Sequence, residues 1–345
     1  GLAGSQADMD TLAASLTTHP SLRDVRIGGF HLTEENVTID AVVSALAQTP
    51  SLEVVSLQLS GSHRSIPCGA GALRDLLTSR SISDLYLSRL GLAESHLHEI
   101  AHALAVRDTV LRSLDLFGNN IENEHIIRMA QGLARNTSLE TLVLPCPPTD
   151  LSVEACTAIS QALQTNTTLV TFNLPRSNLS DQGIVQLAQG LTVNKTLKKI
   201  EVGVSKTVGN EGINALTNML EHNYQLERVV VSSADQSIKQ KAEYYMRLNE
   251  VGRGKILQNG NASREQWVEI LIACADDLDC LLYFVKTNPT ICQFANATHQ
   301  APFICTHELR ISRRHTMTNV SDFHRNVVPK APTSGGQSRR ASAFS

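Results

Sequence analysis

Residues 169–197 read LVTFNLPRSNLSDQGIVQLAQGLTVNKTL. The first six residues fit the pattern L-x-x-L-x-L, through Leu169, Phe172 and Leu174, and a turn follows them. Apolar residues then recur with the spacing of one face of an α-helix. The helical set consists of Ile184, Leu187, Ala188 and Leu191. This stretch therefore predicts one strand followed by one helix.

The strand pattern occurs eight times along the chain, with Ile, Val or Phe allowed in place of Leu. Its first positions are 30, 30, 29, 28, 30, 28 and 29 residues apart. They are Leu22, Leu52, Ile82, Leu111, Leu139, Leu169, Leu197 and Leu226. A fixed period of this length is the signature of a repeat protein, in which each unit packs against its neighbours. The sequence predicts an α/β solenoid with a parallel sheet on its concave side and helices outside.

A small polar residue stands three positions before each strand from the second onward, where the preceding helix must end. These residues are Thr49, Ser79, Asp108, Asn136, Asn166, Asn194 and Asn223. Asparagine tolerates the left-handed conformation that closes a helix, and its amide can bond nearby backbone. Two strands also have an asparagine six residues beyond their middle apolar residue, Asn120 and Asn178. We expect these two amides to bond the backbone of the neighbouring turn.

Residues 178–184 read NLSDQGI, and Leu187, Leu191, Asn194 and Leu197 continue the unit. This unit resembles a leucine-rich repeat of the ribonuclease-inhibitor type, and the resemblance covers about residues 7–236. NOD-like receptor sensor arms, tropomodulin-like proteins and Ran GTPase-activating proteins share that repeat class. The resemblance implies a horseshoe-shaped solenoid that binds another protein through its concave sheet and adjoining loops.

The sequence divides into three predicted domains. Residues 1–236 hold eight strand–helix units after a truncated N-terminal helix. Residues 237–293 have helical spacing and the only Trp, Trp267, and predict a helical C-terminal cap, which a solenoid needs to cover its end. The cap is similar to the tails of uncharacterised leucine-rich-repeat proteins of algae and related protists. Residues 294–345 are rich in Ser, Thr, Arg and Pro, and we expect a disordered tail.

The charge is unevenly distributed. The net charge of −3 argues against a nucleic-acid partner. Residues 306–345 hold seven Lys and Arg against two acids, a net of +5, which leaves −8 for the rest. Within this basic tail, Ser342 and Thr316 each follow two arginines in a pattern that basophilic kinases prefer. Phosphate there would erode the basic charge; the alternative is a tail that is merely solvated.

Composition also bears on the cell compartment. Seven cysteines show no zinc-like spacing, so free thiols in a reducing compartment are expected. The N-terminus lacks the basic region of a signal peptide. The longest purely apolar runs have six residues, whereas a membrane span needs about 20. We expect a cytoplasmic protein with no membrane contact.

No pattern in the sequence predicts catalysis, a metal or a cofactor. The run Gly252-Arg253-Gly254-Lys255 lacks the other residues of a phosphate-binding loop, which favours a structural turn. The acidic cluster at 276–279 lacks the Gly and the distal Glu of a calcium loop. We therefore expect no enzyme activity, no cofactor and no small-molecule substrate.

Two alternatives to a scaffold stay open. Arg89 and Arg176 both follow a strand, where an arginine could reach a bound GTPase and stabilise charge on a transferring phosphoryl group. Ordinary exposed arginines at these positions are the simpler interpretation. The second alternative is the sensor arm of a larger receptor.

The residue between the last two apolar positions of each strand faces the concave side. Tyr86, Asp115 and Val143 hold this position in three consecutive units, and Phe117 stands in the next row. Aromatic side chains beside a carboxylate are typical of binding hot spots. Our hypothesis is that these four residues bind the partner protein. Alternatively they only cover the sheet, and the partner binds loops or helices.

Overall fold

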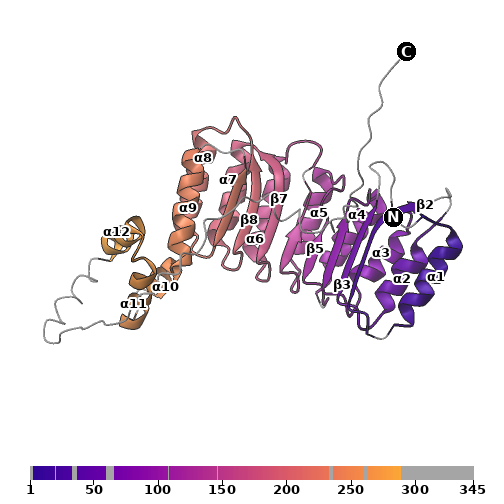
Figure 1. Cartoon of the computed structure of the whole chain (residues 1–345). Helices are drawn as coiled ribbons and strands as arrows, with labels where there is room; N and C mark the ends of the chain where they lie inside the picture. The colour runs from indigo at the N-terminus through magenta and orange to yellow at the C-terminus, as the bar shows by residue number, and fades with distance from the viewer. Residues whose placement is uncertain are drawn as a thin grey trace, which may run out of the picture. The chain divides into compact units, whose positions relative to one another are not determined.

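The computed structural model describes residues 3–19, 21–32, 37–59, 66–107, 109–145, 147–232, 236–259 and 263–288. All of them lie within one compact unit, Gly1–Ile291. Strands and helices alternate along this unit as far as α9, and three short helices follow (Figure 1). The disordered tail and the phosphorylation sites predicted at Thr316 and Ser342 lie outside the described residues.

In the described part of the chain, nine strands form one sheet in which neighbours follow chain order and every pairing is parallel. They are β1 (Ala3–Gly4), β2 (Asp24–Leu32), β3 (Val54–Leu59), β4 (Asp84–Ser88), β5 (Ser113–Asp115), β6 (Thr141–Val143), β7 (Thr171–Leu179), β8 (Lys199–Val204) and β9 (Arg228–Ser232). The eight predicted patterns account for β2 to β9. Only β1, with two residues, was not predicted. The middle apolar residues of the eight patterns stand in one row across the sheet.

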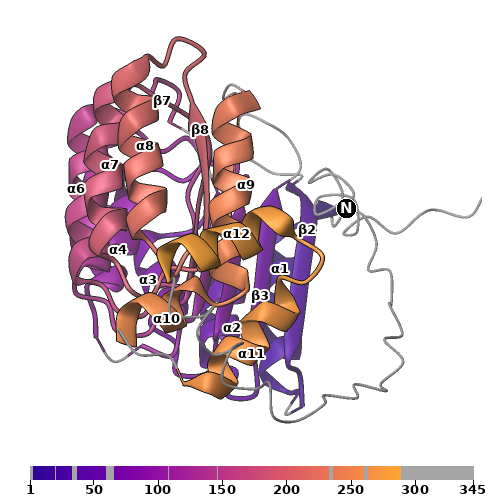
Figure 2. The same cartoon turned by 90° about the vertical axis from the view of Figure 1, so that its left-hand side faces the viewer.

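Helices α1 to α8 connect the strands, α1 to α9 pack against one another in chain order, and α10 to α12 follow. They are α1 (Gln6–Thr17), α2 (Asp40–Gln48), α3 (Ala70–Leu77), α4 (Glu94–Leu104), α5 (Asn123–Leu133), α6 (Val153–Thr165), α7 (Asp181–Val193), α8 (Asn210–His222), α9 (Gln236–Glu250), α10 (Arg253–Asn259), α11 (Arg264–Ala273) and α12 (Leu278–Thr287). Figure 2 shows α6, α7 and α8 stacked on one side of β7 and β8. This arrangement confirms the α/β leucine-rich-repeat solenoid.

The core lies between the sheet and the helices. Strand residues alternate between half-buried and buried, and the buried ones face the helices, as Leu85 and Leu87 do in β4. Leu114 and Phe172 take the equivalent place in later units and are at most 1% exposed. Burying one such side chain stabilises the fold by about 1.5–3 kcal/mol. Because each unit supplies the same set, the core runs continuously along the array.

The asparagine before each of β6, β7, β8 and β9 ties adjacent units together. Nδ2 of Asn166 donates to the carbonyls of Leu133 and Asn136 in the preceding unit, at 2.8 and 3.1 Å. Its Oδ1 accepts from the backbone N–H groups of Thr168 and Leu169, at 3.0 and 2.8 Å. The same arrangement recurs at Asn136, Asn194 and Asn223. Asparagine suits this position because its side chain both donates and accepts.

Two details of the sequence interpretation were wrong. The asparagines that close α6, α7 and α8 are not left-handed, since their φ angles are −73°, −65° and −90°. The turn amide comes from Asn119 rather than exposed Asn120: its Nδ2 donates to the carbonyl of Leu87 at 2.6 Å, and its Oδ1 accepts from Leu90 N–H at 2.9 Å. Asn178 donates to the carboxylate of Asp150 in the neighbouring loop rather than to backbone.

The last helices build a second core. Ile238, Ala242 and Met246 of α9 are buried in the core of the repeats. Beyond them, Trp267 and Phe284 pack edge to face at 6.2 Å in a separate cluster formed by α9 to α12. The C-terminal helices therefore have an apolar core of their own.

Arg253 joins the two cores. Its side chain is fully buried, and Nη2 donates to the carbonyls of Leu220 and Asn223 at 2.8 and 2.9 Å. These carbonyls lie at the end of α8, at the place where Asn166 bonds in an earlier unit. Nε donates to Oδ1 of Asn249 at 2.8 Å. Arg253 and Asn249 thus take, at the end of the array, the place that the asparagines take between earlier units. We call this series of inter-unit contacts the asparagine ladder.

No carboxylate in the described part of the chain forms an ion pair with Arg253, and its charge lies against aromatic rings instead. Its guanidinium lies between the rings of Tyr224 and Tyr245, 5.0 and 4.9 Å from their centres, in cation–π geometry. The negative end of the α8 dipole faces it. Burial lowers the pKa of this guanidinium, and Tyr283 opposes that shift. The glycine-rich run at 252–255 therefore has a structural role: Gly252 lies in a turn, and α10 begins at Arg253.

Among the described residues, no helix is long and apolar enough to cross a membrane. Nor does any group of three or more His, Cys, Asp or Glu side chains in that part of the chain have the arrangement needed to hold a metal ion. The cysteines that the structure describes are free thiols: Cys68, Cys156, Cys274 and Cys280.

Candidate functional site

The face of the sheet opposite the helices, called here the front face, carries two rows of side chains. We name them after one member each. The Tyr86 row runs through Arg26, Ser56, Tyr86, Asp115, Val143, Asn173, Glu201 and Val230. The Asp84 row runs through Asp24, Val54, Asp84, Ser113, Thr141, Thr171, Lys199 and Arg228. All sixteen side chains are half-buried or exposed, so the face is open to solvent.

The structure brings three of the four predicted site residues side by side. Tyr86, Asp115 and Val143 are register partners on β4, β5 and β6, and each is half-buried. Phe117 lies beyond the end of β5, in the turn. Its N–H donates to Oδ1 of Asp115 at 2.7 Å, and its carbonyl accepts from Arg89 N–H at 2.9 Å. Phe117 therefore borders the row at the loop edge.

The N-terminal end of the face has a neutralised pair. The Arg26 guanidinium donates to both carboxylate oxygens of Asp24, at 3.1 Å each. This pairing raises the pKa of Arg26, and the Tyr86 side chain adds a smaller contribution of the same sign. Because Asp24 and Arg26 cancel, the acidic character of this half of the face comes from Asp84 and Asp115.

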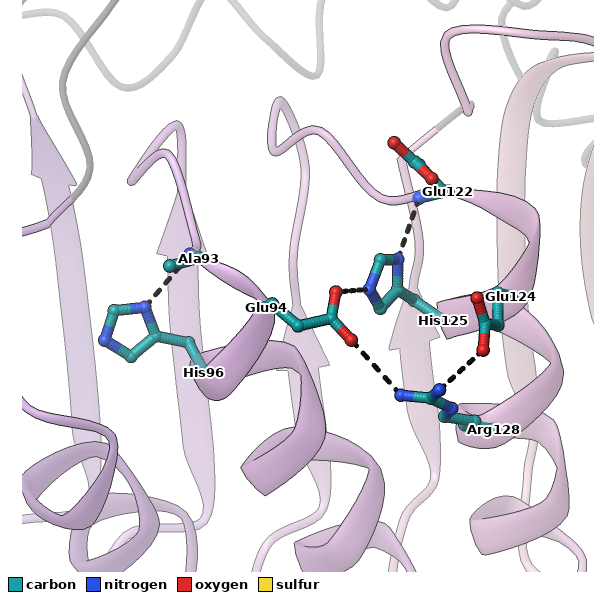
Figure 3. A network of polar contacts seen from close by, with 7 residues as sticks. All are labelled: Ala93, Glu94, His96, Glu122, Glu124, His125 and Arg128. Atoms are coloured by element: carbon teal, nitrogen blue, oxygen red, sulfur yellow. Dashed lines mark hydrogen bonds and ion pairs between the residues drawn. The ribbon is translucent and has the colours of Figure 1, made fainter.

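A polar network beside the loop edge holds α4 against α5, and with them the strands that carry the candidate site (Figure 3). The Glu94 carboxylate accepts from Nε2 of His125 and from Arg128, the latter at 3.2 Å. Arg128 also bonds Glu124 at 2.5 Å. The hydrogen bond from His125 is the main reason that the pKa of exposed Glu94 lies below its ordinary value. Arg128 shifts this pKa in the same direction. Nδ1 of His125 accepts from the N–H of Glu122 at 3.2 Å, so the neutral ring carries its proton on Nε2.

His96 holds the equivalent position one unit earlier, and it acts in the same way. Its Nδ1 accepts from the N–H of Ala93 at 3.0 Å, so Nε2 donates to the carbonyl of Cys68 at 2.8 Å (Figure 3 shows the first contact). The Cys68 thiol lies 3.9 Å from the same nitrogen. Burial raises the pKa of that thiol to about 12, whereas a nucleophilic cysteine needs a lowered pKa. The pair links neighbouring units and is not suited to nucleophilic catalysis.

Arg89 and Arg176 have left-handed backbones, with φ of 55° and 60°. Gly118 stands at the same place in its unit, two residues after the last strand leucine, and has φ of 76°. The left-handed conformation is therefore a property of the repeat's turn and does not single out the arginines. Both arginines are exposed; Arg89 follows the end of β4, as predicted, whereas Arg176 lies within β7 rather than after it.

The sequence interpretation missed the Asp84 row. It considered the residue after the middle apolar position of each strand and the next outward residue, but not the residue before that position. The residue before the middle apolar position, such as Asp84, lies two places from the Tyr86-row residue of the same strand. The two share one face, because side chains alternate along a strand. This alternation was the signal that could have identified Asp84, Lys199 and Arg228.

Comparisons with known proteins are distant. No family model matches the chain. Human NACHT, LRR and PYD domains-containing protein 13 is 23% identical over 217 residues, which are 63% of this chain and 20% of that protein. The chain thus spans about a fifth of the length of this curated relative.

Three solved structures with some similarity have TM-scores of 0.35 to 0.40. The C-terminal domain of Caenorhabditis elegans tropomodulin has a TM-score of 0.40 and 18% identity, covering 48% of this chain and 99% of that one. Leiomodin-1 actin-binding site 2 has a TM-score of 0.39 and 20% identity, covering 49% and 98%. The yeast Rad7–Elc1 complex has a TM-score of 0.35 and 14% identity, covering 66% and 69%.

Proposed function

We propose that this chain is a non-enzymatic scaffold that binds another protein through the front face of its sheet and the adjoining loops. The observation that carries the proposal is the adjacent placement of Tyr86, Asp115 and Val143, with Phe117 at the edge. A solvent-open sheet face that presents an aromatic ring, a carboxylate and an apolar side chain together has the composition of a binding hot spot. The ribonuclease-inhibitor-like subtype and a cytoplasmic location are parts of the same proposal.

Affinity capture with the whole chain tests the proposed site. The native chain is compared with the double variant Tyr86→Ala/Phe117→Ala in lysate of the cells that express it. Truncating two hot-spot aromatics is expected to weaken binding by about 2 kcal/mol or more, or at least thirtyfold. A matched control is Val193→Ala, at the end of α7, where the side chain is 53% exposed.

Partners retained by the native chain and the control, and lost by the double variant, would support the site. Equal thermal unfolding of all three proteins shows that the loss is not caused by misfolding. Retention of the same partners by the double variant would refute the site and direct attention to the loops and helices.

The proposed domain organisation is an array at 1–236, a helical cap at 237–293, similar to those of algal and protist relatives, and a disordered basic tail at 294–345. Limited proteolysis tests it. Rapid removal of the tail followed by a resistant fragment that ends near residue 293 is expected. Early cleavage inside the array would contradict it.

A second candidate function is the sensor arm of a larger receptor. The 217-residue likeness to a protein with NACHT and LRR domains in its name favours it over the GTPase-activating alternative. It requires a nucleotide-binding domain encoded upstream of this sequence. Reading the complete transcript tests that requirement directly.

A further inference from the structure

The Asp84 row changes its chemistry in order along the sheet. Asp84 stands on β4, and the next three strands contribute Ser113, Thr141 and Thr171. The row ends with Lys199 and Arg228 on β8 and β9. From β4 to β9, the Asp84 row therefore consists of one acid, three hydroxyl-bearing residues and two bases.

The three central hydroxyls are available for a ligand. Each of these side chains is half-buried, and within the described part of the chain none of the hydroxyls has a hydrogen-bond partner. They are in register on adjacent strands, so they form a line that crosses the strands. A hydroxyl both donates and accepts, which suits the alternating N–H and C=O groups of an extended backbone.

The basic end carries an uncompensated repulsion. Lys199 and Arg228 are direct register partners, both exposed, and like charges directly opposite each other destabilise a sheet. Among the described residues, no carboxylate forms an ion pair with either one. Glu201 shares the face, two residues along β8, and it leaves this end with one net positive charge. An acidic ligand group would relieve the repulsion.

The acidic end has the opposite character. Asp84 accepts a hydrogen bond from the Ser83 hydroxyl at 2.6 Å, and no basic side chain among the described residues forms an ion pair with it. Asp115 lies diagonally across from it in the Tyr86 row. Arg26, the nearest base on this face, is already paired with Asp24. A basic ligand group therefore fits here.

We propose that the occupant of the front face is an extended peptide segment that crosses the strands along the Asp84 row, with a basic residue over Asp84 and an acidic residue over Lys199 and Arg228. The inference rests on the proposed function and names the chemistry of its partner. The hydroxyls of Ser113, Thr141 and Thr171 bond the backbone of the segment between its two charges.

The spacing of the two charges follows from strand geometry. Adjacent strands lie about 4.8 Å apart, so the four to five steps from Asp84 to Lys199 and Arg228 span roughly 19–24 Å. An extended chain advances about 3.3 Å per residue. The basic and acidic residues of the segment are therefore about six or seven positions apart.

The test selects binders to the full chain from a displayed library of random peptides of about 12 residues, long enough to cross the row. Sequences enriched on the native chain are expected to carry Arg or Lys about six or seven positions from Asp or Glu. With Asp84→Lys, the selected basic residue is replaced by an acid. With Lys199→Glu/Arg228→Glu, the selected acid is replaced by a base. An individual native binder weakens about tenfold on either reversed chain.

Matched controls reverse exposed charges outside both rows: Asp75→Lys on α3 and Lys195→Glu in the loop before β8. They are expected to select the native set of peptides. Unchanged selection on the row variants, or enrichment without the charge spacing, would overturn the proposal. So would the absence of any enriched peptide.

Failure of this proposal is separable from failure of the proposed function. Peptides that lack the charge spacing but are lost with Tyr86→Ala/Phe117→Ala would leave the front face as the binding site and refute only the charge order. A lysate partner lost with that double variant, together with no enriched peptide, would indicate a folded partner instead of an extended segment. Far-UV circular dichroism of every variant verifies that the sheet is intact.

Discussion

Substituting Asn166 by alanine tests the asparagine ladder as the link between units. The change removes five hydrogen bonds: two to carbonyls of the preceding unit, two from backbone N–H groups of the following turn, and one from the Thr168 hydroxyl at 3.4 Å. Leu169 is fully buried and Asn136 is 5% exposed, so the N–H of the first and the carbonyl of the second lose these partners away from water. A buried polar group left without a partner costs about 1–3 kcal/mol. The expected loss in the free energy of unfolding is therefore about 2–4 kcal/mol.

Urea unfolding of the whole chain gives the magnitude, and hydrogen exchange gives the location. Solenoid units interact mainly with their neighbours, so the damage is expected at the junction of α5, α6, β6 and β7 rather than throughout. The amide of Leu169 should lose protection first, because Oδ1 of Asn166 is its acceptor.

Asn120→Ala is the matched control, because Asn120 is exposed and the ladder does not include it. A change within about 0.5 kcal/mol is expected for that variant. A second variant, Asn166→Asp, keeps the acceptor for Leu169 but buries a carboxylate against the two carbonyls of the preceding unit, so a loss at least as large as that of Asn166→Ala is expected. If Asn166→Ala changes the stability no more than the control does, the ladder does not hold the units together.

Two further predictions concern the C-terminal helices and the thiols. Arg253→Lys keeps a buried charge but loses the planar guanidinium that bonds two carbonyls. We expect the free energy of unfolding to fall by about 3 kcal/mol, with the fastest hydrogen exchange in α10 to α12. Uniform exchange along the chain would contradict this. Burial raises the pKa of Cys156 to about 12, above its ordinary value of 9.0. The protonated thiol therefore contributes stability below about pH 9, and this contribution is lost as the pH rises toward 12. At pH 8, a disulfide reagent such as DTNB should modify this thiol only on unfolding, and rapid reaction of native Cys156 would count against burial.

The apolar period was sufficient to predict the strands, because the core admits only a narrow range of side chains at those positions. Even Phe172, in place of Leu, stands in the same register row as Leu142 and Ile200. The turns were less predictable. Gly118 is left-handed, and the amide that reaches the neighbouring turn belongs to Asn119, one residue earlier than expected. A one-residue offset in a turn changes which side chain points inward, and apolar spacing does not report it.

Arg253 shows a second limit of sequence reasoning. In a glycine-rich run beside Lys255, an arginine suggests a phosphate ligand or a solvated turn. Its burial depends on Tyr224 and Tyr245, which are 29 and 8 residues away, and on carbonyls at the end of α8. No local pattern encodes that combination, because the ladder it completes exists only when the units are stacked.

The rows of the front face likewise exist only when the units are stacked. The repeat constrains the buried positions of each strand and leaves the outward positions free to vary between units. Asp84, Thr141 and Lys199 hold the same place in three different units, and as separate residues they indicate nothing. Register aligns them into one line across the sheet, with opposite charges at its ends. In a solenoid, binding specificity is therefore carried by the residues in which the units differ. Reversing the charges at the two ends of one row thus tests the proposal more directly than truncating a buried side chain that every unit shares.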